Sequence, residues 1–361
     1  MEFVELAELC DKGSSNLAQK DLVFDSGIYP VYGAPGEITK VDFFHQSKPY
    51  LGLIKDGAGV GRVMQLPANS SVIGTIQYIF PKENVDLKYL YYLIKYLDLG
   101  KANTGATIPH IYFKDYKKRK VKVREYSEQK HIGQILELID SYLRTYKKVL
   151  EQYDLLIKSR FDEFNKNNDN VKVLKLEAIC TSIVRGPFGS ALKVENFVKK
   201  SDTSVKVYEQ SNAIQRSAAI GSRYISREHY ESLRRFKCKP GDIIMSCSGT
   251  IGKLFILPND AEEGIINQAL CKFTLGKELL PEVFLLYMDI LIGNIETKGS
   301  GIKNISAVKF IKNLEIPVPP IGIQSKLLFE LNQINKLKSD VQKSIDETQL
   351  LMDSLMQEYF G

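Results

Sequence analysis

The pattern of apolar and polar positions predicts two long helices. From Glu128 to about Phe164, apolar residues recur every three or four positions, with no proline and no glycine beyond Gly133. The stretch from Gln324 to Tyr359 carries a second long apolar stripe. Apolar residues at this spacing lie along one face of a helix, and a stripe of this length is typical of a coiled coil. We therefore predict that the two helices pack against each other.

The two stretches match when the first is moved forward by 195 residues. This shift places Ile132 on Leu327 and Phe164 on Tyr359, so that apolar positions coincide. Tyr142 and Tyr153 also fall on the stripe, and we expect both in the core of the helix pair, with their hydroxyls reaching its edge. The core predicted for the pair consists of Ile132, Ile139, Tyr146, Leu150, Leu327, Ile334, Val341 and Ile345.

Shorter elements precede each long helix. In residues 1 to about 125, glycine and proline separate β-like runs, and one segment has a helical pattern. The expected strands are Tyr50–Ile54, Ser71–Phe80 and Lys120–Val123, and the expected helix is Leu87–Tyr96. These elements indicate a mixed α/β globule.

The globule is repeated later in the chain. Residues 53–67 match residues 244–258 at an offset of 191, and residues 6–10 match residues 176–180. A repeat of this kind indicates two copies of one unit, each ending in a long helix. The predicted fold class is α+β, with two mixed α/β globules separated by two long antiparallel coiled-coil helices and related by a pseudo-twofold internal repeat.

Chain reach sets the direction of the second helix. At 1.5 Å per residue the first helix is about 55 Å long. The polar linker Asn165–Asn170 spans at most about 20 Å, so the second globule must follow the far end of that helix. If the two stripes are buried together, the second helix runs back and the arrangement is a dumbbell. In the alternative, each helix packs on its own globule. The predicted domains are residues 1–126, 127–166, 167–321 and 322–361.

Composition is that of an intracellular protein with two folded domains. The chain has 361 residues, of which 44% are apolar, which is enough to build a core in each globule. Its five cysteines include no CxxC pair, so neither a disulfide framework nor a zinc site is indicated. The acidic N-terminus lacks the pattern of a secretory signal, and no apolar run approaches the length of about 18 residues that a membrane span needs. We expect a cytoplasmic location.

Positive charge is unevenly distributed. The net charge is +6, and basic residues are concentrated in residues 114–124 and 223–239. Such clusters suit the neutralisation of nucleic-acid phosphates. A solvated strand face and a solvated loop would explain them equally well.

The glycine-rich segments do not match cofactor-binding motifs. Residues 57–61 lack the GxGxxG spacing, and residues 248–254 lack the spacing of a phosphate-binding Walker loop. Each segment suits a tight turn between strands, or a close approach of backbone to a phosphate or a groove edge. The four histidines are scattered without metal-ligand spacing, and no NPPY-type methylase tetrapeptide or nuclease carboxylate cluster is present. The sequence therefore predicts no enzyme activity and no metal site.

The order of globule, helix, globule and helix resembles the specificity (S) subunits of type I restriction-modification enzymes, the HsdS family. The resemblance covers essentially the whole chain. In the first half it is carried by residues 27–33, 57–61, 107–111 and 128–129, and in the second half by residues 185–190, 241–244, 248–252, 316–320 and 324. Two segments depart from the pattern. Residues 121–124 lack the usual proline, and Lys303-Asn304-Ile305 replaces a histidine-type motif.

The resemblance implies a chain without catalysis of its own. Each globule would be a target recognition domain that reads one half of a bipartite, asymmetric sequence in double-stranded DNA, and the helices would set the gap. Two modification subunits would dock on the helices and methylate adenine, and restriction subunits would join them. The chain itself would bind no cofactor, because S-adenosylmethionine, ATP and Mg²⁺ would belong to the partners. Half-sites one helical turn of DNA apart are about 34 Å centre to centre, a separation that the helices could span.

Base reading requires polar side chains on loops. The candidates for DNA contact are Tyr32, Lys55, Arg62, Thr107, His110, Arg185, Ser190, Lys193, Gln210, Asn212, Ser248 and Lys303. Residues 117–119 are better suited to phosphate contact or subunit docking. For each candidate an ordinary loop or capping role is the competing interpretation. For the whole chain, the competing function is a coiled-coil scaffolding protein with two protein-binding globules.

Overall fold

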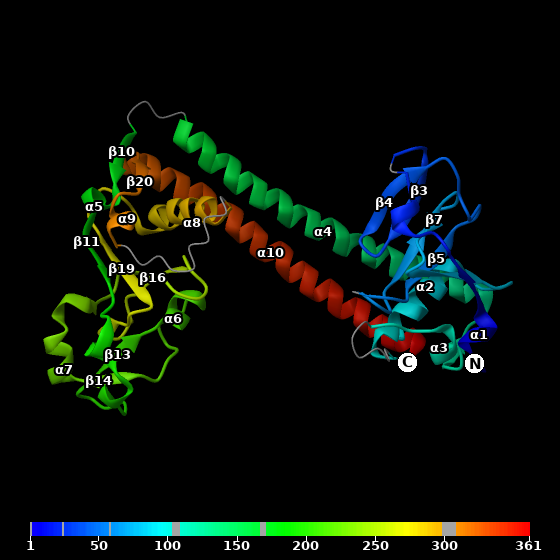
Figure 1. Cartoon of the computed structure of the whole chain (residues 1–361), viewed down its shortest axis with the longest axis horizontal. Coiled ribbons are helices and arrows are strands. Elements are labelled where there is room, and N and C mark those ends of the chain that lie inside the picture. The colour runs from blue at the N-terminus through cyan, green and yellow to red at the C-terminus, as the bar shows by residue number, and fades with distance from the viewer. Residues whose placement is uncertain (1, 24, 58, 103–108, 167–170, 298–307) are drawn as a thin grey trace. The chain divides into compact units, whose positions relative to one another are not determined.

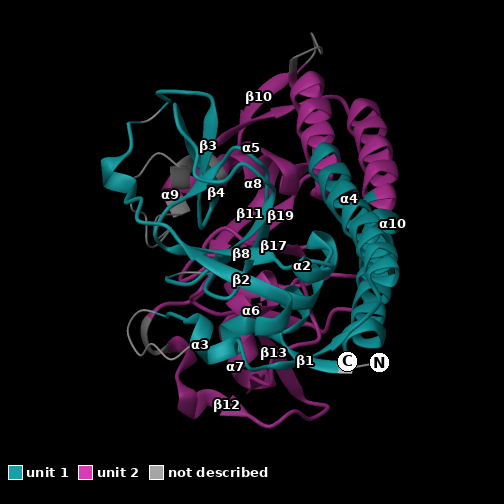
Figure 2. Cartoon of the chain, turned by 90° about the vertical axis from the view of Figure 1, so that its right-hand side faces the viewer, with its two compact units in different colours: residues 1–152, 338–361 teal, residues 153–337 magenta. Residues whose placement is uncertain are grey.

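The computed structural model describes residues 2–23, 25–57, 59–102, 109–166, 171–297 and 308–361. The chain forms two compact units, shown in separate colours in Figure 2. Unit 1 comprises residues 1–152 and 338–361, and unit 2 comprises residues 153–337. Each unit therefore contains one globule and a part of both long helices, as the two colours along α4 and α10 in Figure 2 show; Figure 1 labels the elements along the chain.

Unit 1 is a mixed globule of short strands and helices. Its elements before the first long helix are β1 Glu2–Glu5, α1 Leu6–Leu9, β2 Cys10–Ser14, β3 Tyr29–Gly33, β4 Gly36–Val41, β5 Tyr50–Ile54, β6 Val63–Leu66, β7 Ser71–Val72, β8 Ile76–Pro81, α2 Leu87–Tyr96, α3 Phe113–Tyr116 and β9 Lys120–Val123. The first long helix, α4, extends over Tyr126–Lys166. The strands form sheets of order β2-β8-β5-β6, β4-β3-β7 and β1-β9.

Unit 2 contains a second set of elements. They are β10 Lys172–Lys175, α5 Leu176–Ile179, β11 Cys180–Arg185, β12 Phe197–Val198, β13 Ser204–Tyr208, α6 Gln210–Ile214, β14 Tyr224–Ser226, α7 Arg227–Ser232, β15 Lys237–Cys238, β16 Ile243–Ser246, β17 Leu254–Ile256, β18 Gly264–Ile266, β19 Leu270–Leu275, α8 Pro281–Thr297, α9 Val308–Lys312 and β20 Glu315–Val318. The second long helix, α10, extends over Ile321–Phe360. The sheets have the orders β11-β19-β16-β17, β12-β14-β13-β18-β15 and β10-β20.

The strand orders confirm the internal repeat. The four-stranded sheet β2-β8-β5-β6 has its counterpart in β11-β19-β16-β17. Strand β3 is parallel to β7 and antiparallel to β4, just as β13 is parallel to β18 and antiparallel to β14. The two-stranded sheets β1-β9 and β10-β20 also correspond, since each lies at the entry to a long helix. One folding plan therefore generates both globules.

The expected run Ser71–Phe80 is wrong as a single strand. It passes from one sheet to another, because β7 pairs with β3 whereas β8 pairs with β2 and β5. The break lies at Ile73 and Gly74, whose amides donate to the carbonyls of Tyr32 at 3.0 Å and Leu17 at 2.8 Å. A run of apolar residues does not reveal such a change of sheet.

The two long helices pack antiparallel within each unit. In unit 1, Ile132 and Ile139 near the start of α4 share a core with Met352, Met356 and Phe360 near the end of α10. In unit 2 the other ends meet, and the end of α4 shares a core with the start of α10. The residues concerned are Phe161, Phe164, Leu327, Leu331 and Ile334. Two matched apolar stripes thus produce the expected pair.

Burial differs along the predicted helix core. Ile132, Ile139, Leu327 and Ile334 are buried, whereas Tyr146, Leu150, Val341 and Ile345 are only partly buried. The placement of Tyr142 in the core is wrong, since this side chain is half exposed and stacks on Tyr146. Leu143, one position further along the helix, is buried instead.

Among the described residues, no helix combines the length and the apolar content that crossing a membrane requires.

Candidate nucleic-acid interface

In unit 1, hydrogen bonds join several loops that follow the strands of the two larger sheets. The Gly74 amide donates to Leu17 after β2, and the Lys55 amide after β5 donates to the Thr75 carbonyl at 3.0 Å. The Arg62 guanidinium donates to the carbonyl of Ala34 in the β3–β4 turn. These contacts join the loops at residues 15–18, 34–35, 55–57, 59–62 and 73–75.

The glycine-rich segment of unit 1 is a turn between antiparallel strands β5 and β6. Gly61 has a φ of +86°, and a Cβ at this position would lie 2.1 Å from the amide nitrogen of Gly100. Only glycine tolerates both the left-handed backbone and this close approach. The turn interpretation is therefore confirmed, and the turn presents the exposed Arg62 at its end.

In unit 2, the corresponding loops are joined in the same manner. The Gly186 amide after β11 donates to the Leu270 carbonyl at 2.9 Å, and the Asn267 amide donates to the Tyr208 carbonyl at 3.0 Å. The Ser248 hydroxyl donates to Oε1 of Gln210 at 3.3 Å. A Cβ at Gly186 would lie 1.8 Å from the Asn267 carbonyl oxygen, so the crossing of these two loops requires glycine.

The turns of the two units are closed by equivalent hydrogen bonds. In unit 1 the Ile54 amide donates to the Arg62 carbonyl at 2.9 Å, and in unit 2 the Ser246 amide donates to the Lys253 carbonyl at 2.9 Å. Lys253 is therefore the structural counterpart of Arg62, and it is also exposed. The candidates chosen from the sequence missed Lys253, although the offset of 191 already aligned it with Arg62.

The structure brings together most of the described candidates of unit 1. Lys55 and Arg62 belong to the joined loops, and Tyr32 lies in β3, where its carbonyl accepts from the Ile73 amide. Residues 56 and 110 form a bridge between backbones that adds His110. Burial raises the pKa of the Tyr32 hydroxyl, which thus stays a neutral donor and acceptor. Thr107 lies outside the described residues. Whether any of these side chains contacts DNA stays a prediction.

In unit 2, Gln210 and Ser248 are in contact on adjoining loops, and both are partly exposed. Arg185 is 6% exposed, donates from Nε to the Gln268 carbonyl at 3.3 Å and lies over the ring of the exposed Phe188. Lys193 is exposed and forms an ion pair with Glu195 at 3.3 Å. Ser190 belongs to the short 3-10 helix Gly189–Leu192, and Lys303 lies outside the described residues.

Asn212 has a structural role in this fold, contrary to its selection as a base-reading residue. The side chain is 0% exposed. Its Oδ1 accepts from the Glu209 amide at 2.8 Å, and its Nδ2 donates to the carbonyls of Ser217 at 2.9 Å and Ile220 at 3.0 Å. Both donors of the amide are used within unit 2, so this side chain holds the loop after α6 and has no N–H left for a base.

The basic cluster of residues 223–239 is largely neutralised. Arg223 pairs with Glu209 at 2.7 Å and Arg227 with Glu263 at 2.7 Å. Arg234 and Lys237 both pair with Glu231, at 2.8 Å and 3.0 Å. Exposed ion pairs of this kind contribute little to stability, and they lower the positive potential that the sequence count suggests.

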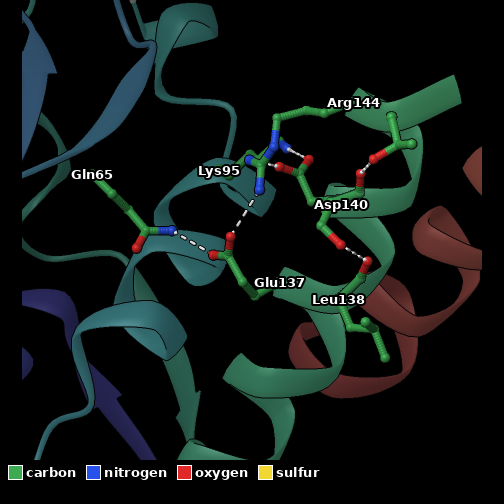
Figure 3. Close-up of polar contacts among 8 residues, drawn as sticks. Gln65, Lys95, Glu137, Leu138, Asp140 and Arg144 are labelled. Atoms are coloured by element: carbon green, nitrogen blue, oxygen red, sulfur yellow. Dashed lines mark hydrogen bonds and ion pairs between the residues drawn. The ribbon is translucent and has the colours of Figure 1, made fainter. Parts of the chain in front are cut away.

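A polar network attaches helix α4 to the globule of unit 1 (Figure 3). Glu137 accepts hydrogen bonds from Gln65 of β6 at 3.2 Å and from Arg144 at 2.8 Å. Asp140 binds the same arginine and also pairs with Lys95 of α2 at 3.3 Å. Partial burial opposes the ionisation of Glu137, but the hydrogen bonds from Arg144 and Gln65 outweigh it and hold the pKa of this carboxyl below its usual value.

No group of three or more histidine, cysteine, aspartate or glutamate residues is placed to hold a metal ion in the part of the chain that the structure describes. The five cysteines are buried, and burial raises the pKa of both Cys10 and Cys180 to about 12. A thiol of this kind is not a nucleophile at neutral pH.

Comparison with known protein families assigns the repeated unit. The model of the type I restriction modification DNA specificity domain matches residues 1–152 and again residues 168–348. The chain belongs to this family. It is a DNA specificity protein of the type I restriction-modification class, and each matched range contains one copy of the globule together with part of the long helix that follows it.

Solved structures of the family share the fold. The S subunit of the type I restriction-modification system from M. genitalium is 16% identical, with a TM-score of 0.61 over 100% of this chain and 96% of that one. A structure from work on complex assembly and conformational transition of the type I R-M system is 13% identical, with a TM-score of 0.61 over 99% and 97%. The HsdS subunit from Thermoanaerobacter tengcongensis is 13% identical, with a TM-score of 0.49 over 99% and 96%. No curated protein matches the chain.

Proposed function

We propose that the two specificity domains read the two halves of a bipartite, asymmetric target in double-stranded DNA. The observation that carries this proposal is the loop set that recurs in both units with different side chains. Arg62 and Lys253 occupy equivalent turns, yet the Gln210–Ser248 pair of unit 2 corresponds to no such pair among the described residues of unit 1. A common scaffold with different polar loops suits two readers of different sequences, since base edges are distinguished by donor and acceptor patterns.

Within each loop set, the side chains divide by chemistry. Arg62 and Lys253 are exposed cations that suit phosphate or guanine contact. Gln210 has an amide that can pair with adenine, and the Ser248 hydroxyl orients it. We assign base reading in unit 2 to Gln210 and Ser248, and a supporting role to Asn212.

The helix pair sets the gap between the half-sites and docks two modification subunits. The support is that each unit contains a part of both long helices, so that each globule packs on both helices. Restriction subunits complete the system. A solved relative was obtained in work on complex assembly of a type I system, which is the setting expected for such a chain.

The chain performs no bond chemistry itself. S-adenosylmethionine, ATP and Mg²⁺ bind to the partner subunits, and this chain determines the DNA sequence at which they act.

A map of methylated adenines in DNA from cells that carry this chain with its modification partners tests the proposal. The expected result is one motif with two specified parts and a constant gap. Exchange of residues 1–125 for those of a relative with another specificity should change one part only. A continuous motif, or a change in both parts after the exchange, would contradict the proposal.

A finer test uses single residues. The Gln210→Ala complex should lose discrimination at one base pair of one half-site, because a bidentate base contact contributes about 1–3 kcal/mol of discrimination. Gln342→Ala is the matched control, since this glutamine lies exposed on α10 and bonds only within its own helix to Asp346 at 2.9 Å. Relaxed discrimination in the control, or none in the Gln210 variant, would remove Gln210 from the set of base readers.

A scaffolding protein with two protein-binding globules would behave differently in salt. DNA binding through phosphates weakens steeply as the salt concentration rises, because counterions are released on binding. Binding of the assembled complex to duplex DNA should therefore fall by orders of magnitude between low and moderate salt. A salt-independent affinity would favour the scaffold.

A further inference from the structure

Gln129 is a buried glutamine in the first turns of α4 that fastens this helix to its globule. The side chain is 2% exposed. Its Oε1 accepts from the backbone amide of Asp86 at 3.0 Å. Its Nε2 donates to the backbone carbonyls of Arg124 at 2.9 Å and Asn84 at 3.3 Å. One amide group thus connects the start of the long helix with the segment that leads into α2.

Gln324 makes the same three connections in unit 2. It is 0% exposed and lies in the first turns of α10. Its Oε1 accepts from the Leu280 amide at 2.9 Å, and its Nε2 donates to the carbonyls of Glu278 at 2.8 Å and Pro319 at 2.7 Å. Leu280 directly precedes α8, just as Asp86 directly precedes α2.

The partners of both glutamines are backbone groups. In each unit the side-chain oxygen accepts from the backbone N–H just before the shorter helix, α2 or α8. The side-chain nitrogen donates to two carbonyls, one just before the shorter helix and one just before the long helix. Three bonds to two chain segments fix both the position and the rotation of the long helix. A buried amide with all these bonds made has little freedom, because an unmade bond leaves a desolvated group.

Close packing beside Gln129 supports this fixation. One turn along α4, a Cβ at Gly133 would lie 3.0 Å from a carboxylate oxygen of Asp86 and 3.1 Å from the amide of Tyr89. Helix α4 therefore approaches the first turn of α2 at the same place where Gln129 binds. Further along, Asp140 and Lys95 join the two helices again, as Figure 3 shows. Side-chain contacts thus continue the attachment that the glutamine begins.

We infer that Gln129 and Gln324 are positioning residues that set the direction in which each long helix leaves its globule, and thereby the single gap length at which both half-sites can be read. The inference rests on the proposed function of the two specificity domains. Neither glutamine contacts DNA in this role. Loss of the bonds should leave each half-site sequence unchanged and broaden the tolerated gap.

The test measures gap tolerance in the assembled modification complex. Methionine resembles glutamine in length and volume but forms no comparable hydrogen bonds, so the variants are Gln129→Met and Gln324→Met. Gln342→Met is the control on an exposed helix surface. Each complex methylates a plasmid library in which the two half-sites are separated by the native gap or by one base pair more or fewer. The readout is the ratio of methylation at altered gaps to methylation at the native gap.

This ratio should rise about tenfold in each glutamine variant. A tenfold change corresponds to the loss of about one buried hydrogen bond, which no longer restricts the angle between the long helix and its globule. The ratio should stay at the wild-type value in the control. A lower amount of folded complex reduces both methylation rates and cancels in the ratio, so a purely structural role would not move it.

Three results would overturn the inference. The ratio could stay at the wild-type value in both glutamine variants, the control could broaden equally, or neither variant could assemble although the control does. Failure of the proposed function itself is recognised separately, because the wild-type complex would then methylate no two-part motif at any gap.

Discussion

Replacement of Asn212 by alanine separates a structural role from a DNA-reading role. The side chain is fully buried and makes three hydrogen bonds, with the Glu209 amide and with the carbonyls of Ser217 and Ile220. Alanine removes all three. The sequence alone suggested that Asn212 contacts a base, whereas its burial indicates that it holds the loop after α6. The variant distinguishes these two roles.

The magnitude follows from the groups left without partners. A buried group that loses its hydrogen bond costs about 1–3 kcal/mol. The backbone groups of residues 209, 217 and 220 are partly exposed, so water replaces some of what is lost. We expect the free energy of unfolding of unit 2 to fall by about 2–3 kcal/mol, with the base preference of the complex unchanged at every position.

Urea denaturation of the free chain, followed by far-ultraviolet circular dichroism, measures the change in unfolding free energy. Asn332→Ala is the control, since this asparagine is exposed on α10 and its loss should change stability by less than about 0.5 kcal/mol. A loss below about 0.5 kcal/mol for Asn212→Ala, together with an altered methylated motif, would refute the structural interpretation.

Three further outcomes are expected. Phe360→Ala removes a ring that packs in the core of unit 1 and should lower its unfolding free energy by about 3–4 kcal/mol, whereas Leu350→Ala at an exposed position should change it little in the same urea titration. The thiols of Cys10 and Cys180, whose pKa values burial raises to about 12, should resist alkylation at pH 8 until the chain is unfolded, and rapid reaction of the native chain in a mass-spectrometric assay would contradict their burial. The pKa of Glu137 is lower in the folded state than its ordinary value of 4.5. Its contribution to the free energy of unfolding is therefore fully present above pH 4.5 and is lost as the pH falls through the folded pKa. The difference in unfolding free energy between wild type and Glu137→Gln should shrink over this acid range and not at alkaline pH.

The sequence was most informative where one pattern extends over many residues. The long helices, the strand Tyr50–Ile54 and the helix Leu87–Tyr96 follow from periodicity and from glycine and proline punctuation, and all are present. The repeat at a constant offset was equally visible, because both globules use one strand order. Local pattern is sufficient where a single face of an element decides its burial.

Other features depend on contacts that are distant in sequence. Ser71–Phe80 has the pattern of one strand, but its two ends pair with different partners. Asn212 has the chemistry of a base reader, yet its amide is used by two carbonyls further along the chain. Lys253 does not stand out within the second half alone, because its equivalence with Arg62 depends on the same turn closing in both units.

The composition of unit 1 has a consequence for synthesis of the protein. Its globule is translated before the second globule, yet its core includes Met352, Met356 and Phe360. Until these residues have been translated, the stripe that carries Ile132 and Ile139 has no covering helix. The nascent chain therefore exposes an apolar helix face throughout production of the second globule, and ribosomes that stall before residue 352 would release a product that needs chaperone protection.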